Sequence, residues 1–167
     1  MKRISLFFLG ITLSIILGTA CYSFSGASIP PNVRTFSIEF FPNRAPLVNP
    51  SLSADVTDGL RSYISSRSSL REDEFNPDIE ISGEITDYSL TPIAAQADAQ
   101  AALQRLTITV RVNFANNVNS NDSFTQTFSI FRDFDSSLDF SSLEDDLVRE
   151  ILDEMVDRIF MRAFGNW

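Results

Sequence analysis

The chain has 167 residues, and its 22 aspartate and glutamate residues outnumber 13 lysine and arginine residues, so its formal net charge is −9. Such an acidic surface disfavours nonspecific binding to nucleic acid. The chain has no histidine, one cysteine and no glycine-rich phosphate loop, which excludes histidine acid–base chemistry, an internal disulfide and the usual zinc sites. We therefore expect one domain that is not an enzyme and binds no cofactor or metal.

The first residues have the pattern of a bacterial lipoprotein signal. Lys2 and Arg3 precede an apolar run over residues 4–17, and three small residues then lead to Cys21. This order predicts that residues 1–20 form a cleaved signal peptide and that the Cys21 thiol is acylated, which would anchor the chain in a membrane. The alternative is an ordinary secretory signal with a free thiol at Cys21. It stays open because lipoprotein signals usually have leucine three residues before the cysteine, where this chain has Gly18.

Residues 21–32 follow as a predicted tether. The segment consists mainly of small and polar residues and ends near the pair Pro30-Pro31, which resists helix formation. Tyr22 follows the cysteine where an aspartate would indicate retention in the inner membrane, and this favours the outer membrane. We expect residues 33–167 to form a single folded domain.

The domain is expected to begin with a strand and a helix. Alternating residues over 36–40 predict a strand that buries Phe40 along with the two apolar residues before it. Asn49 followed by Pro50 predicts the start of a helix, with Asn49 as its cap. Apolar residues at three- and four-residue spacing over 52–64 would form the buried face of that helix.

Three further strands are expected. Alternation over 79–86 predicts the first, and the change of parity after Asp87 predicts a bulge there. Residues 91–104 are rich in alanine and glutamine, and we favour a loop over a short helix. Alternation over 105–114 and 124–134, separated by a polar hairpin loop, predicts two strands that pair with the first in a meander.

A long amphipathic helix is expected at the C-terminus. Ser141 and Glu144 have the spacing of a capping box, and the acids at 144–146 suit the first turn of a helix. The apolar stripe over residues 143–160 is wide, which indicates deep packing against a sheet or one flank that contacts a partner. The order strand-helix-strand-strand-strand-helix predicts an α+β fold, a two-layer sandwich whose four-stranded, mostly antiparallel sheet carries both helices on one face.

Carboxylates are the only remaining candidates for catalysis. They cluster at residues 72–74 and 144–146. We interpret the first cluster as a solvated loop and the second as a consequence of helix polarity. No catalytic residue is therefore predicted.

Several segments together resemble the LptE family of lipopolysaccharide-assembly lipoproteins, in the form found in Bacteroidetes-type bacteria. They are the cysteine followed by YSFSG, the first strand TFSIEFFPN, the stretch GEITDYSLTP, the long alternating strand and the C-terminal helix. The resemblance implies an outer-membrane lipoprotein, lipid-anchored on the periplasmic side. It would partner and plug an LptD-type β-barrel, and assist lipopolysaccharide assembly and transport to the cell surface.

The resemblance also raises the question of direct lipopolysaccharide binding. The loops 91–104 and 116–123 contain no cation, so only Arg105, Arg111 and Arg132 on the strands are candidates to pair with phosphates. Their alternative role is to pair with nearby acids across the sheet. An alternative function for the whole chain is a periplasm-facing lipoprotein that binds a hydrophobic ligand between sheet and helices, or that is accessory to another envelope assembly complex.

Overall fold

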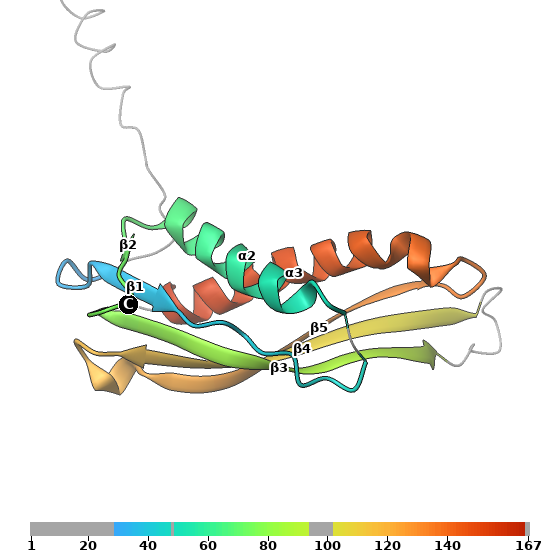
Figure 1. Ribbon diagram of the computed structural model, residues 1–167, viewed down its shortest axis with the longest axis horizontal. Helices are drawn as coiled ribbons and strands as arrows, with labels where there is room; N and C mark the ends of the chain where they lie inside the picture. Colours follow the sequence, from blue (N-terminus) through green and yellow to red (C-terminus); the bar gives the residue numbers. More distant parts are fainter. Residues whose placement is uncertain (1–28, 48, 94–101, 166–167) are drawn as a thin grey trace, which may run out of the picture.

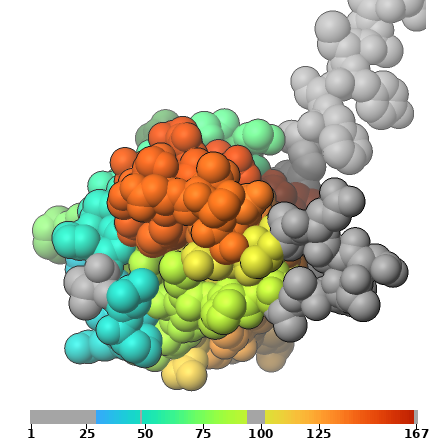
Figure 2. Space-filling view, turned by 90° about the vertical axis from the view of Figure 1, so that its right-hand side faces the viewer, coloured from blue at the N-terminus to red at the C-terminus, as the bar shows by residue number. Residues whose placement is uncertain are grey.

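The computed structural model describes residues 29–47, 49–93 and 102–165. A five-stranded sheet forms one layer and two helices form the other, both on the same face of the sheet (Figure 1). The end view in Figure 2 shows the helix layer lying directly on the strand layer. The elements are β1 (Thr35–Ile38), α2 (Leu52–Arg67), β2 (Arg71–Glu72), β3 (Ile79–Ile93), β4 (Leu103–Asn116), a short 3₁₀ turn (Ser120–Asp122), β5 (Phe124–Asp135) and α3 (Phe140–Phe164).

The predicted α+β fold with helices on one face is confirmed, but the sheet has five strands in the order β2-β1-β3-β4-β5. The expected meander of β3, β4 and β5 is antiparallel, whereas β1 runs parallel to both of its neighbours, so the sheet is mixed. The strand that the sequence did not predict is β2. Its two residues, Arg71 and Glu72, are both exposed and offer no apolar alternation.

The prediction for the first strand is wrong at its end. Strand β1 stops at Ile38, Phe40 is 63% exposed, and the next residue, Phe41, is fully buried. The amide of Phe41 donates to Oγ1 of Thr57 on α2 at 3.1 Å. This bond to the helix layer directs Phe41 into the core and leaves Phe40 outside.

Helix α2 begins two residues later than expected. Asn49 does not cap it; instead Oδ1 of Asn49 accepts hydrogen bonds from the amide and hydroxyl of Ser51 at 3.1 and 3.0 Å. These bonds form a turn before the helix, and its N-cap residue is Ser51. An asparagine side chain stabilises such a turn as readily as it caps a helix, so the sequence pattern fits both.

Helix α3 begins earlier than expected, and the predicted capping box is wrong. The N-cap residue is Asp139, whose carboxylate accepts a hydrogen bond from the Ser141 hydroxyl at 2.6 Å and from the Ser141 amide at 3.4 Å. The helix starts at Phe140, so Glu144 lies beyond the first turn. Its carboxylate instead accepts hydrogen bonds from Tyr88 and Asn49, which lie outside α3.

Strands β3 and β4 are longer than predicted. The bulge expected near Asp87 is confirmed by a register shift between Ile85 and Asp87. Residues 91–93 belong to β3 and residues 103–104 to β4, so the expected loop over 91–104 is wrong at both ends. The central residues 94–101 lie outside the described part of the chain.

The wide apolar stripe of α3 is covered within the chain. One side of the helix packs on the sheet, where the ring of Phe164 meets that of Phe114 at a centroid distance of 5.8 Å. The flank packs on α2, where Phe160 meets Tyr63 at 5.5 Å. The sheet and α2 together account for the width of the stripe.

Candidate functional site

The face of the sheet opposite the helices, which we call the open face, is lined mainly by small polar side chains. Cross-strand hydrogen bonds tie them together: Oγ1 of Thr109 and Oγ of Ser129 lie 2.9 Å apart, and Oγ1 of Thr125 donates to Oδ1 of Asn113 at 2.9 Å. The open face therefore presents uncharged donors and acceptors at the regular spacing of strands. Its hydroxyl and amide residues are Ser82, Ser89, Thr107, Thr109, Asn113, Thr125, Thr127 and Ser129.

Arg105 lies at one end of the open face and is fully engaged. Its guanidinium donates to both carboxylate oxygens of Asp133, at 2.7 and 2.9 Å, and stacks on Phe131 at 3.7 Å from the ring centroid. The hydrogen bond with Asp133 raises the pKa of Arg105 and lowers the pKa of Asp133. The pair is a neutral cross-strand unit on an exposed surface.

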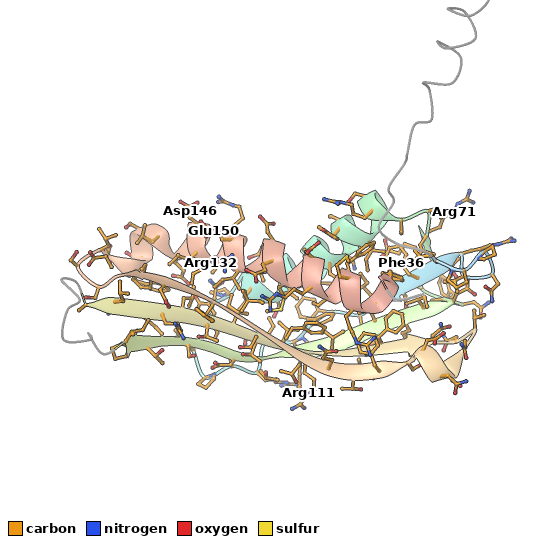
Figure 3. The ribbon with its side chains drawn as sticks, turned by 180° about the vertical axis from the view of Figure 1, so that it is seen from behind. Phe36, Arg71, Arg111, Arg132, Asp146 and Glu150 are labelled. Carbon is orange, nitrogen blue, oxygen red and sulfur yellow. The ribbon has the colours of Figure 1, made fainter. Side chains whose placement is uncertain are left out.

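Arg111 lies toward the other end of the open face, with a single ion pair. Its guanidinium donates to Glu84 on β3 at 3.1 Å, and its side chain is 56% exposed. Figure 3 shows it pointing away from the helix layer. Of the three strand arginines, Arg111 is the most accessible to a ligand phosphate.

Arg132 lies on the other side of the sheet. It points toward α3, where it contacts Glu150 at 3.1 Å and Glu154 at 2.9 Å (Figure 3). The hydrogen bond to Glu154 raises the pKa of Arg132 and lowers that of Glu154. Arg132 thus holds α3 against β5.

The structure does not bring the three arginines together. Arg105 and Arg111 share a face, but six positions of β4 separate them by roughly 20 Å, since a strand rises about 3.4 Å per residue. Arg132 lies on the opposite face. A phosphate-binding cluster of all three is therefore not formed.

Cys21, the predicted lipidation site, lies outside the described residues, and so does most of the predicted tether. The part that is described, from Ile29, leads into the domain through a turn in which the amide of Val33 donates to the carbonyl of Pro30 at 3.0 Å. Val33 is buried in the core, and the boundary at residue 33 stays a prediction.

A partly buried polar link between β3, α3 and the loop before α2 was missed from the sequence. The hydroxyl of Tyr88 on β3 donates to Glu144 on α3 at 2.6 Å, and Nδ2 of Asn49 donates to the same carboxylate oxygen at 2.8 Å. Burial and the hydrogen bond to Glu144 raise the pKa of Tyr88. The sequence did offer a sign of it: the alternation of apolar residues shifts by one position before Tyr88, and this shift turns the Tyr88 side chain toward the helix layer.

The described residues offer little for a hydrophobic ligand. A groove of about 480 Å³ lies between α2 and α3, and its lining is dominated by polar and acidic side chains, with Val148 and Leu152 as its larger apolar members. No group of histidine, cysteine or acidic side chains in the described part of the chain is arranged to hold a metal ion. Nor is any helix in that part long and apolar enough to cross a bilayer.

Comparison with known proteins identifies the family. The family model described as LptE, lipopolysaccharide-assembly, matches residues 33–163. The chain belongs to the LptE family. This confirms the resemblance seen in the sequence and makes the chain a member of a family of non-enzymatic proteins of lipopolysaccharide assembly in the cell envelope.

Solved structures share this LptE fold at low sequence identity. Rare lipoprotein B from Shewanella oneidensis is 13% identical, with 77% of this chain and 92% of that chain covered and a TM-score of 0.55. A minor lipoprotein from Acinetobacter baumannii is 15% identical, with 79% and 94% covered and a TM-score of 0.50. A hypothetical protein from Chlamydia trachomatis is 11% identical, with 80% and 99% covered and a TM-score of 0.52. None of the curated proteins compared with the chain matches it significantly in sequence.

Proposed function

We propose that the mature chain is an outer-membrane lipoprotein that occupies the lumen of an LptD-type β-barrel, assists the assembly of that barrel and so supports lipopolysaccharide transport to the cell surface. Acylated Cys21 would hold it on the periplasmic side, with residues 21–32 as the tether. Membership of the LptE family supports the general role.

The observation that carries the proposal is the chemistry of the open face. A protein inside a barrel lumen must meet a polar wall, so it needs exposed hydrogen-bonding groups and few uncompensated charges. Hydroxyl and amide residues make up most of its centre, and Arg105 and Arg111 are paired with acids. Two acids of β3 on this face, Glu80 and Asp87, have no ion pair among the described residues, and Asp87 accepts a hydrogen bond from Ser89. No layer of the chain's described residues covers this long polar face, and the lumen wall of a barrel would supply one.

Direct contact with lipopolysaccharide is a secondary proposal, and it concerns the open face rather than all three arginines. Arg111 is best placed for it, since its guanidinium makes one ion pair and retains free donors. Arg105 would have to give up a bidentate bond to Asp133. Arg132 would have to leave two acids of α3.

The test is capture of the barrel from the native outer membrane. The full chain, tagged at its C-terminus and expressed at its native level, is purified after detergent solubilisation, and its partners are identified by mass. We expect an LptD-type barrel in near-stoichiometric amount. A preparation that is folded and lipidated but carries no such barrel would contradict the proposal.

A matched pair of variants tests which surface makes the contact. Thr109→Arg places a bulky charge at the centre of the open face, and Ser65→Arg places the same side chain on the exposed surface of α2. We expect Thr109→Arg to lose the barrel and Ser65→Arg to retain it, with circular dichroism confirming that both fold. Equal capture by the two variants would argue against the open face.

A further inference from the structure

Strand β5 is an edge strand without the usual protection. It is twelve residues long and pairs with β4 over its whole length without a register shift. Its first eight residues, 124–131, contain no charge and no proline. Soluble proteins normally shorten, bend or charge such an edge, because its free backbone groups pair readily with another chain.

The other exposed edges of the sheet do have such protection. Strand β2, at the opposite side, consists of two charged residues, Arg71 and Glu72. The half of β3 that extends beyond β1 is interrupted by the bulge at Asp87 and carries Pro92 near its end. The long unprotected edge is therefore specific to β5, which lies at the near side of the sheet in Figure 3.

The hydrogen-bond pattern shows which backbone groups of β5 are free. The amide of Ser136 donates to the carbonyl of Ala102 at 3.0 Å, in the same register as the β4–β5 ladder. In an antiparallel ladder, residue pairs that exchange backbone hydrogen bonds alternate with pairs that do not. The backbone N–H and C=O groups of the even-numbered residues of β5 therefore bond to β4, and those of the odd-numbered residues point away from β4. Consistently, Arg132 reaches around to donate to the carbonyl of Phe131 at 2.9 Å.

Three consecutive outward positions lie on this edge. In the part of the chain that the structure describes, no strand lies beyond β5, so the backbone N–H and C=O of Thr125, Thr127 and Ser129 face an open edge. Their side chains lie on the open face. A strand added at this edge would therefore extend the open face by one more row of residues.

We propose that β5 is a strand-addition site, at which an extended segment of the barrel partner pairs with Thr125–Ser129 and continues the sheet. This rests on the proposed function, because the barrel supplies the segment. The occupant is an extended polypeptide, since only a backbone offers N–H and C=O groups in the alternation that this edge requires. A second copy of this chain is disfavoured, because the formal charge of −9 becomes −11 in each mature copy when Lys2 and Arg3 are removed with the signal peptide.

The test removes one outward N–H and nothing else from the ladder. Thr127→Pro deletes a donor that faces away from β4, a position at which proline is tolerated on an edge strand. Thr127→Ala keeps that N–H and is the matched control. We expect the full lipidated chain with Thr127→Pro to capture ~10-fold less barrel than the chain with Thr127→Ala, because both lack the hydroxyl and only the proline variant loses a backbone hydrogen bond and leaves a carbonyl of the partner unpaired.

The outcomes separate this inference from the function on which it rests. If the wild type captures no barrel, the proposed function itself is contradicted. If the wild type and Thr127→Pro capture the barrel equally, strand addition at β5 is wrong while the barrel partnership stands. A wild-type chain that forms dimers in solution, which Thr127→Pro abolishes, would assign the edge to a second copy and would also overturn the proposal.

A second measurement covers the case in which Thr127→Pro fails to fold. Amide hydrogen exchange of the wild type is compared between the free chain and its complex with the barrel. We expect exchange in peptides spanning residues 124–131 to slow in the complex, while peptides from α2 exchange at the same rate in both states. Unchanged exchange over 124–131 would overturn the proposal.

Discussion

Gly83 on β3 lies directly beneath the ring of Phe41, which packs on the sheet at this position. A Cβ at this position would collide with the backbone carbonyl of Arg111 and would come within 2.5 Å of Cε1 of Phe41. Glycine thus allows Phe41 to be buried over β3. The sequence shows Gly83 in phase with the apolar residues of the strand, but it does not show which ring fills the space.

Two glycine substitutions should have opposite effects on stability. Gly83→Ala forces apart a fully buried ring and a strand backbone, and we expect it to lower the free energy of unfolding by about 2 kcal/mol. Gly59→Ala on α2 meets only Cγ1 of Val156 at 3.8 Å, and we expect it to raise that energy by about 0.5–1 kcal/mol because alanine favours helix. Urea unfolding measures both. A neutral Gly83→Ala would contradict the packing described.

Tyr88 should make stability depend on alkaline pH. Its pKa is raised in the folded chain, so its contribution is complete below the unfolded pKa of about 10 and is lost as the pH rises above that value. We expect the free energy of unfolding to fall above about pH 10, and the fall to be smaller in Tyr88→Phe. Thermal unfolding at several alkaline pH values tests this.

Tyr63→Phe is the control for that experiment. The hydrogen bond to Asp157 also raises the pKa of Tyr63, but its side chain is only partly buried. We therefore expect a smaller change in the alkaline dependence than for Tyr88→Phe. Equal changes in the two variants would contradict burial as the main cause of the raised pKa of Tyr88.

Strands with strict alternation could be predicted from the sequence, and helix ends could not. The antiparallel strands, the bulge and the helix faces follow from the spacing of apolar residues. The caps failed because asparagine, serine and glutamate bond locally in several ways, and tertiary contacts decide among them: Glu144 turns to Tyr88, and Asn49 forms a turn. Strand β2 has no alternation, and it exists because its backbone pairs with β1.

The candidate site could be predicted only in part. The alternation of β4 placed Arg105 and Arg111 on the outward face, as the structure has them. The alternation of β5 also puts Arg132 in phase with the buried Phe128 and Ile130, on the helix side, although the sequence analysis grouped it with the other two arginines. The partners of Arg132 could not be predicted, because Glu150 and Glu154 belong to a helix whose position over the sheet depends on tertiary packing. The free edge of β5 was also beyond the sequence, since it depends on the order of strands in the sheet.

The arginines of the two faces should respond differently to substitution. Arg132→Gln removes ion pairs between β5 and α3, and we expect it to lower the free energy of unfolding by about 0.5–1 kcal/mol without changing lipopolysaccharide binding. Arg111→Gln should leave stability nearly unchanged and weaken that binding. Chemical unfolding and a binding assay with purified lipopolysaccharide measure the two effects. Weaker binding with Arg132→Gln alone would place the contact on the helix side.

The whole molecule combines a proposed anchor, a closed core and a polar surface. The described residues hold no arrangement suited to a metal, and the groove between the helices is polar and acidic. The anchor would act by raising the local concentration of the domain beside the proposed barrel partner.

Cys21→Ser should separate anchoring from folding. We expect the variant to accumulate as a folded, unlipidated protein that captures much less barrel at native expression, because the local concentration is lost. Overexpression should restore part of the capture by mass action. Full capture by the soluble form at native expression would mean that the tether contributes little.

The most direct test of the central claim is the folded state of the barrel in cells depleted of this chain. Folded and unfolded forms of the LptD-type barrel are separated by their different electrophoretic mobility before and after heating. We predict that depletion shifts the barrel to its unfolded form, and that the wild-type chain restores folding whereas Thr109→Arg does not. Normal barrel folding after complete depletion would contradict the account.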